Sequence, residues 1–158
     1  MLQLTRILAP TDFSEHSNHA LGYAADLARQ FRARLVLVHV VSNDALESIS
    51  KAHVPPHPVD KVYEDLTQEV REQYAKHVAP EVRKTLETEI LVLPGVPYLE
   101  IVHAARVERV DLIVMATHGR TGLSHALMGS VTEKVLRKAP CPVLSIRPVG
   151  AESVAYAA

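Results

Sequence analysis

The sequence predicts an α/β domain in which a five-stranded parallel sheet carries helices on both faces. Five short stretches rich in apolar and β-branched residues alternate with stretches whose apolar residues recur at helical spacing. Buried strands separated by helices are typical of a parallel sheet with right-handed crossovers. The chain has 158 residues, of which 47% are hydrophobic, and this suits one core. We therefore expect a single domain over residues 1–148 and a loose tail over residues 149–158.

The first half of the chain contains two predicted strands with a helix between them. Residues 4–9 form the first strand, which Pro10 ends. Apolar residues at helical spacing predict an amphipathic helix over residues 14–31. Residues 34–41 (RLVLVHVV) are almost continuously apolar, as expected of a strand buried on both faces. A proline-rich loop over residues 55–58 follows.

The second half continues the same alternation. A helix begins near Asp60, and Pro80 ends or kinks it. Pro97 suits the first position of another helix, over residues 97–109. A polar loop containing three glycines spans residues 118–129. The remaining predicted elements are strands over residues 89–93, 111–117 and 143–146 and a last helix over residues 130–139.

The composition argues against several classes of protein. Lys and Arg number 17 against 18 for Asp and Glu, and this balance disfavours electrostatic capture of nucleic acids or anionic membranes. No run of 18 apolar residues predicts a membrane span. The one cysteine, Cys141, has no intrachain partner for a disulfide, and its place between two prolines suits a tight turn more than a reactive thiol. We expect a cytoplasmic protein with neither nucleic-acid nor membrane partners.

The last glycine of the loop precedes a candidate anion site. Gly129 opens the final predicted helix, and the first turn of a helix presents unpaired N–H groups that suit phosphate oxygens. Ser130 and Thr132 add hydroxyl donors. The same residues allow a second interpretation, because Ser130 and Glu133 have the spacing of a capping box that needs no ligand.

Two common phosphate fingerprints are missing. The chain has neither G-x-G-x-x-G after the first strand nor G-x-x-x-x-G-K-[ST]. Rapid phosphoryl transfer needs placed cations, a metal ion and a positioned nucleophile, and the sequence supplies no evident set of these. The pattern therefore favours binding of a phosphate-bearing ligand over fast hydrolysis.

Four segments together resemble the universal stress protein family. The resemblance runs from about residue 4 to residue 147, and the segments that carry it are residues 7–14 (ILAPTDFS), 114–122 (VMATHGRTG), 127–135 (LMGSVTEKV) and 139–144 (APCPVL). It implies a Rossmann-like fold with the strand order 3-2-1-4-5. The ATP-binding branch of the family carries G-x2-G-x9-G-[ST]. Here Gly119, Gly129 and Ser130 match this motif, and Ala116 stands in place of the first glycine.

The resemblance also implies a role for each candidate site residue. Asp12 contacts the ribose or the metal–phosphate region, Pro10 and Thr11 line the nucleoside pocket, Val40 offers backbone groups to adenine, Met115 packs near the base, and Gly119, Gly129, Ser130, Val131 and Thr132 hold the phosphates. The implied cofactor is ATP, with Mg²⁺ or Mn²⁺ at the phosphates. The implied partner is a second copy of the chain, paired through the edge strand Val143–Ile146, which is too apolar to be left exposed.

Several of these side chains have alternative interpretations. Asp12 also fits a helix cap or an Asx-turn. His118 either lies in solvent or contacts phosphate, and Arg120 is either solvated or a clamp on the triphosphate. His39, inside an apolar strand, fits a buried histidine with a hydrogen-bond partner. The pairs His16 with His19 and His53 with His57 lack the further ligands that a zinc site needs.

With this resemblance, our hypothesis is a stress-response homodimer that binds ATP with a divalent cation and uses its occupancy as a signal. One alternative is a dimeric interaction module that binds no nucleotide. Another is a slow ATP hydrolase in which His118 or Asp12 positions water.

Overall fold

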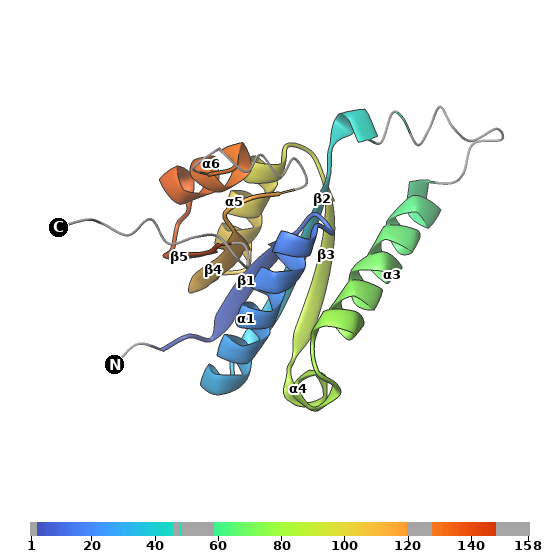
Figure 1. Cartoon of the computed structure of the whole chain (residues 1–158). Coiled ribbons are helices and arrows are strands. Elements are labelled where there is room, and N and C mark those ends of the chain that lie inside the picture. The colour runs from blue at the N-terminus through green and yellow to red at the C-terminus, as the bar shows by residue number, and fades with distance from the viewer. Residues whose placement is uncertain (1–2, 46–47, 49–58, 120–127, 148–158) are drawn as a thin grey trace.

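The strands form one sheet, as the sequence predicts. The computed structural model describes residues 3–45, 48, 59–119 and 128–147. Within this part of the chain, five strands pair in parallel in the order β3-β2-β1-β4-β5 (Figure 1). They are β1 (Arg6–Thr11), β2 (Arg34–Val41), β3 (Thr88–Pro94), β4 (Leu112–Ala116) and β5 (Val143–Ile146).

Helices cover both faces of the sheet. Helices α1 and α3 lie over one face, and α5 and α6 lie over the other (Figure 1). Their side chains pack against the sheet there. The described helices are α1 (Glu15–Phe31), α3 (Val59–His77), α4 (Pro80–Thr85), α5 (Pro97–Val107) and α6 (Ser130–Lys138). The short α4 was not predicted; it begins at Pro80, because proline suits the first position of a helix. The predicted proline-rich loop and C-terminal tail lie outside the described residues.

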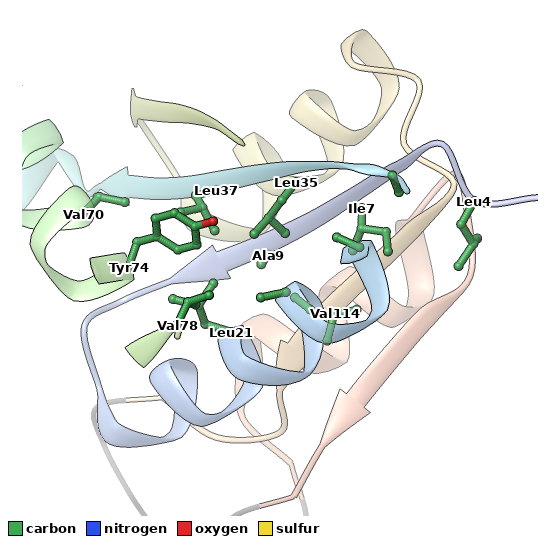
Figure 2. Close-up of a cluster of buried hydrophobic side chains, with 14 residues drawn as sticks. Leu4, Ile7, Ala9, Leu21, Leu35, Leu37, Val70, Tyr74, Val78 and Val114 are labelled. Carbon is green, nitrogen blue, oxygen red and sulfur yellow. The ribbon is translucent and has the colours of Figure 1, made fainter. Parts of the chain in front are cut away.

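The core has two layers because the central strands are buried on both faces. In β2, Leu35 and Leu37 face α1 and α3, whereas Val36 and Val38 face α5 and α6. Figure 2 shows the first layer, in which Ile7 of β1 lies among side chains of β2, α1 and β4. This two-sided burial explains the continuous apolar run of the second predicted strand. Among the described residues, no helix is both long and apolar enough to cross a membrane.

The prediction that Pro10 ends the first strand is wrong, because β1 runs from Arg6 to Thr11. The carbonyl of Arg6 accepts a hydrogen bond from the amide of Asp111, so even-numbered backbone groups of β1 face β4. The register between β1 and β4 ends at Leu8. The N–H that Pro10 lacks would therefore point toward β4, whereas the pairing of β1 with β2 continues through Thr11 and carries the strand past the proline. The other predicted elements are confirmed to within two residues at each end.

Candidate functional site

A cavity of about 310 Å³ opens at the carboxyl ends of β1, β2 and β4. Its volume lies at the lower end of the range of about 300–1,000 Å³ for small-molecule sites. In open α/β sheets, ligands bind where the strand order reverses, and here this point lies between β1 and β4. The cavity therefore lies where the fold class favours a ligand.

The structure brings the predicted site residues of its described part around this one cavity. Arg120 lies outside the described residues. The predicted residues that line the cavity are Pro10, Thr11, Asp12, Val40, Met115, Ala116, His118, Gly119, Gly129, Ser130, Val131 and Thr132. Their contact with a nucleotide stays a prediction.

Four lining residues were missed by sequence reasoning: Ser17 of α1, Val38 of β2, and Pro97 and Ile101 of α5. In the sequence, Ser17, Val38 and Ile101 fall within predicted helices or a predicted strand, and they have no predicted role in the site. A signal for α5 exists in the sequence, because Gly95 stands just before it. Gly95 has a φ of +139° and donates a hydrogen bond to the carbonyl of Val41. This turn brings the start of α5 next to the end of β2.

The cavity has chemically different ends. Val38, Val40 and Met115 belong to the core layer under α5 and α6, and they give the cavity apolar walls. Asp12 and the start of α6 supply charged and polar groups. This division suits a ligand with a flat apolar ring and a charged tail.

The start of α6 has no side-chain cap. Gly129 is the N-cap residue, with φ −67° and ψ 146°, and no side chain accepts a hydrogen bond there. Ser130 is the first helical residue, so the interpretation as a capping box is wrong. The carboxylate of Glu133 instead lies 2.9 Å from the guanidinium of Arg137, one turn further along the helix.

The first amides of α6 remain available for a ligand. The Gly129 amide is already used, because it donates to the carbonyl of Thr117 at 2.7 Å. Within the described residues, no hydrogen bond takes up the backbone N–H groups of Ser130, Val131 and Thr132. These three donors, with the positive end of the helix dipole, make an anion-binding position at the edge of the cavity.

The hydroxyl of Thr132 is not the donor to phosphate that the sequence suggested. It donates to the carbonyl of Ala116 at 2.9 Å and is buried. This bond fastens the first turn of α6 to the end of β4. Thr132 therefore offers a ligand its backbone N–H rather than the hydroxyl hydrogen.

The glycine positions explain the close packing of this edge. A Cβ on Gly129 would lie 3.2 Å from the carbonyl oxygen of Thr117, so a side chain there fits only if α6 or this carbonyl shifts by a few tenths of an ångström. A Cβ on Gly119 would lie 2.7 Å from Oδ2 of Asp12. Ala116, which replaces the first glycine of the motif, lies in β4 and has no positive φ, so its methyl group causes no backbone strain.

Asp12 is held in a tight turn after β1. Its Oδ1 accepts a hydrogen bond from the amide of Ser14 at 3.0 Å, which is the predicted Asx-turn. The other carboxylate oxygen lies beside Gly119. Asp12 thus makes the turn and lines the cavity at once, so the two interpretations of this residue are compatible.

His118 is half-buried at the cavity rather than extended into solvent. Its Nδ1 lies 2.9 Å from the hydroxyl of Thr117, and its ring meets the edge of the His16 ring at a centroid distance of 6.3 Å. His19 instead packs edge-on against Tyr23. The described residues contain no group of three or more His, Cys, Asp or Glu side chains arranged for a metal ion. His53 and His57 lie outside them.

Cys141 packs against the core layer under α5 and α6. Burial raises the pKa of its thiol, and the nearby Asp111 carboxylate raises it further, against a smaller opposing effect of the Ile113 amide. A raised pKa disfavours the thiolate, which is the reactive form. This agrees with a structural rather than a chemical role for Cys141.

Comparison with known proteins identifies the family. The sequence profile of the universal stress protein family matches residues 3–147. The chain belongs to this family. This universal stress protein is 34% identical over 148 residues to universal stress protein MJ0531 of Methanocaldococcus jannaschii, which covers 90% of this chain and 81% of that protein.

Solved structures agree with the family. The structure of MJ0577 from the same organism has a TM-score of 0.71 at 30% identity and covers 93% of this universal stress protein and 98% of that chain. A universal stress protein of Archaeoglobus fulgidus, solved in complex with dAMP, has a TM-score of 0.60 at 22% identity, covering 92% of this chain and 99% of that chain. At that identity the likeness concerns the fold alone.

Proposed function

We propose that this universal stress protein binds ATP in the cavity, together with a divalent cation, and uses its occupancy as a signal. One observation carries the proposal: the uncapped start of α6 presents three backbone donors at the edge of a cavity with apolar walls. The donors suit phosphate oxygens, and the walls suit a purine ring.

The energy of such a complex is sufficient without a P-loop lysine. A hydrogen bond to a charged group contributes about 1.5–3 kcal/mol. Three of them, with packing of the base between Val40, Met115 and Ile101, reach the roughly 8 kcal/mol of a micromolar complex. The negative charge of Glu133, in the first turn of α6, opposes the binding of phosphate. The Arg137 guanidinium lies 2.9 Å from this carboxylate and offsets part of its charge.

Asp12 fits a divalent cation that arrives with the nucleotide. Mg²⁺ is usually held by one or two carboxylates, substrate phosphates and water. The Asp12 carboxylate lines the cavity, and the Ser14 amide orients one of its oxygens. A bound cation would neutralise phosphate charge, and Asp12 would hold it at the mouth of the cavity.

Calorimetric titration of the full chain with ATP and MgCl₂ tests the proposal. We expect saturable binding in the micromolar range, and its absence below about 1 mM would end the proposal. Gly129→Ala should weaken binding by about threefold, because its methyl group requires a shift of a few tenths of an ångström at the start of α6. Gly22→Ala is the matched control, since a Cβ on Gly22, in α1, meets no atom within 4 Å.

We also propose that two copies pair through β5. This strand pairs with β4 on one side only within the described residues, and Leu144 is 39% exposed. The carbonyls of Pro142 and Ile146 accept hydrogen bonds from Ile113 and Thr117, so the backbone groups of Ser145 face the outer edge. An outer edge of this kind favours antiparallel pairing with its copy.

Ser145→Pro tests the pairing. It removes an N–H from the outer edge and leaves the bonds to β4 intact, so we expect a monomer by light scattering after gel filtration. Ser145→Ala should stay dimeric. A monomeric unsubstituted protein would contradict the pairing and leave the nucleotide proposal standing.

A further inference from the structure

A buried histidine, His39 of β2, lies next to the carboxyl end of β1. His39 pairs in register with Thr11 and is 7% exposed. Its Nδ1 lies 2.8 Å from the carbonyl oxygen of Thr11. Because a carbonyl can only accept, Nδ1 carries the hydrogen and donates it. As predicted, this is a buried histidine with a hydrogen-bond partner, and that partner is the peptide joining Thr11 to Asp12.

Phe13, which follows Asp12 in the chain, also contacts His39. Phe13 has a φ of +62°, a left-handed conformation that costs a bulky residue free energy. Contacts with Thr11 and His39 help to hold it there. Its amide donates to Oγ1 of Thr11 at 3.1 Å, and its ring lies against the His39 ring at a centroid distance of 4.3 Å. Strained backbone persists only where its surroundings hold it, and His39 is part of those surroundings.

In the chain, Asp12 lies between the Thr11 carbonyl and Phe13, both of which contact His39. The His39 bond fixes the peptide before it, and the packing of Phe13 on His39 fixes the residue after it. The carboxylate that results lines the cavity, with one oxygen beside Gly119. His39 itself is not among the cavity residues, because its side chain lies on the α1 side of the sheet, where Phe13 packs.

We infer that His39 is a positioning residue, which acts on the nucleotide only through Asp12. This inference rests on the proposed function. It predicts that the contribution of Asp12 to binding depends on His39, although the two side chains have different surroundings. A histidine that merely fills the core would affect stability and leave that contribution unchanged.

A double-mutant cycle on the full chain tests the inference, with calorimetric affinity for MgATP as the readout. Asp12→Asn removes the charge and keeps an oxygen for the Ser14 amide. His39→Leu removes the donor and keeps an apolar side chain. We expect His39→Leu to weaken binding about tenfold in the unsubstituted chain. In a chain that already carries Asp12→Asn, we expect His39→Leu to weaken binding by less than about twofold more.

Two further variants separate the hydrogen bond from general damage. His39→Asn places an amide nitrogen where Nδ1 lies, so it should keep most of the affinity. Tyr74→Phe is the control for loss of a buried contact, because the Tyr74 hydroxyl lies 3.0 Å from that of Thr88 on the same face of the sheet. We expect it to lower stability and leave MgATP affinity unchanged.

If His39→Leu does not fold, His39→Phe takes its place in the cycle. It keeps a ring to pack on Phe13 and removes the donor to the Thr11 carbonyl. Additive effects of the two substitutions would overturn the inference while the nucleotide proposal stands. Failure of the unsubstituted protein to bind MgATP would overturn both.

Discussion

Three helices begin at the cavity, and two of them, α1 and α6, differ in how their first amides are used. At α1, Ser14 is the N-cap and its side chain accepts from the Ser17 amide at 3.1 Å. The acidic Glu15 follows in the first turn. At α6, the N-cap is Gly129 and no side chain takes this role. One helix start is satisfied by its own sequence, whereas the other leaves donors at the cavity.

This difference shows which helix start is suited to an anion. A carboxylate in the first turn of α1 adds negative charge where phosphate would have to come, and the capping oxygen occupies a donor. Loops and helices at the same edge of the sheet can therefore differ in function although they share a fold. The three predictions below change one member of this pair or a carboxylate outside it.

The largest effect is expected from giving α6 its own anion. Ser130 is exposed, so Ser130→Asp places a carboxylate beside the first amides without disturbing the core. We expect ATP affinity measured by calorimetry to fall on the order of a hundredfold, because the carboxylate competes for the donors and repels phosphate. Ser130→Asn, which has the same shape without the charge, should lose much less. Equal losses for the two variants would show that charge at this helix start is unimportant.

A smaller effect is expected from uncapping α1. Ser14→Ala removes the oxygen that accepts from the Ser17 amide. The free energy of unfolding in urea should fall by about 1 kcal/mol. ATP affinity should change less than about twofold, since the Asp12–Ser14 bond uses a backbone amide and remains. A large loss of affinity would place α1 within the anion site and break the comparison.

The smallest effect is expected at Asp111, at the amino end of β4 and away from both helix starts. Its Oδ2 accepts from the amide and hydroxyl of Thr5, each at 2.7 Å, and from the amide of Arg6 at 3.0 Å. Burial raises the pKa of Asp111, but the Thr5 and Arg6 hydrogen bonds and the Arg6 charge outweigh it and hold the pKa below its usual value.

The sign of the pH effect follows from that direction. A pKa lower in the folded than in the unfolded chain adds stability above the unfolded pKa, and this stability is lost as pH falls through the folded pKa. Asp111→Asn should therefore reduce the stability difference between neutral pH and about pH 3, measured by urea unfolding. ATP affinity at neutral pH should not change. An unaltered pH profile would mean that Asp111 contributes nothing to acid sensitivity.

The strand and helix order was predictable because periodicity reports burial directly. The continuous apolar run of β2 and the helical spacing in α1 follow from packing on both faces or one face of each element. Pro10 misled the prediction, because whether a proline interrupts a strand depends on which neighbour its missing N–H would face. That neighbour is known only once the sheet is assembled.

The site was predictable where the chain itself is unusual and not where it is ordinary. Gly119 and Gly129 interrupt the pattern and so attracted attention, whereas Ile101 and Ser17 look like any other helical residues that face a core. Ser130 and Glu133 have the spacing of a capping box and do not form one, because the Gly129 amide is bound to the Thr117 carbonyl and the helix starts at Ser130 itself, one residue earlier than a Ser130 cap requires. Local sequence does not encode that tertiary bond.

Because α6 has no side-chain cap, the thermal stability of the protein depends on which solutes bind at that helix start. A first turn without partners is a weak point, and any solute that binds the folded chain there raises the melting temperature. Binding to the native state alone stabilises it by about 2.7 kcal/mol when the solute is present at a hundred times its dissociation constant. On the nucleotide proposal, the lifetime of this protein under thermal or proteolytic challenge would follow the ATP concentration around it.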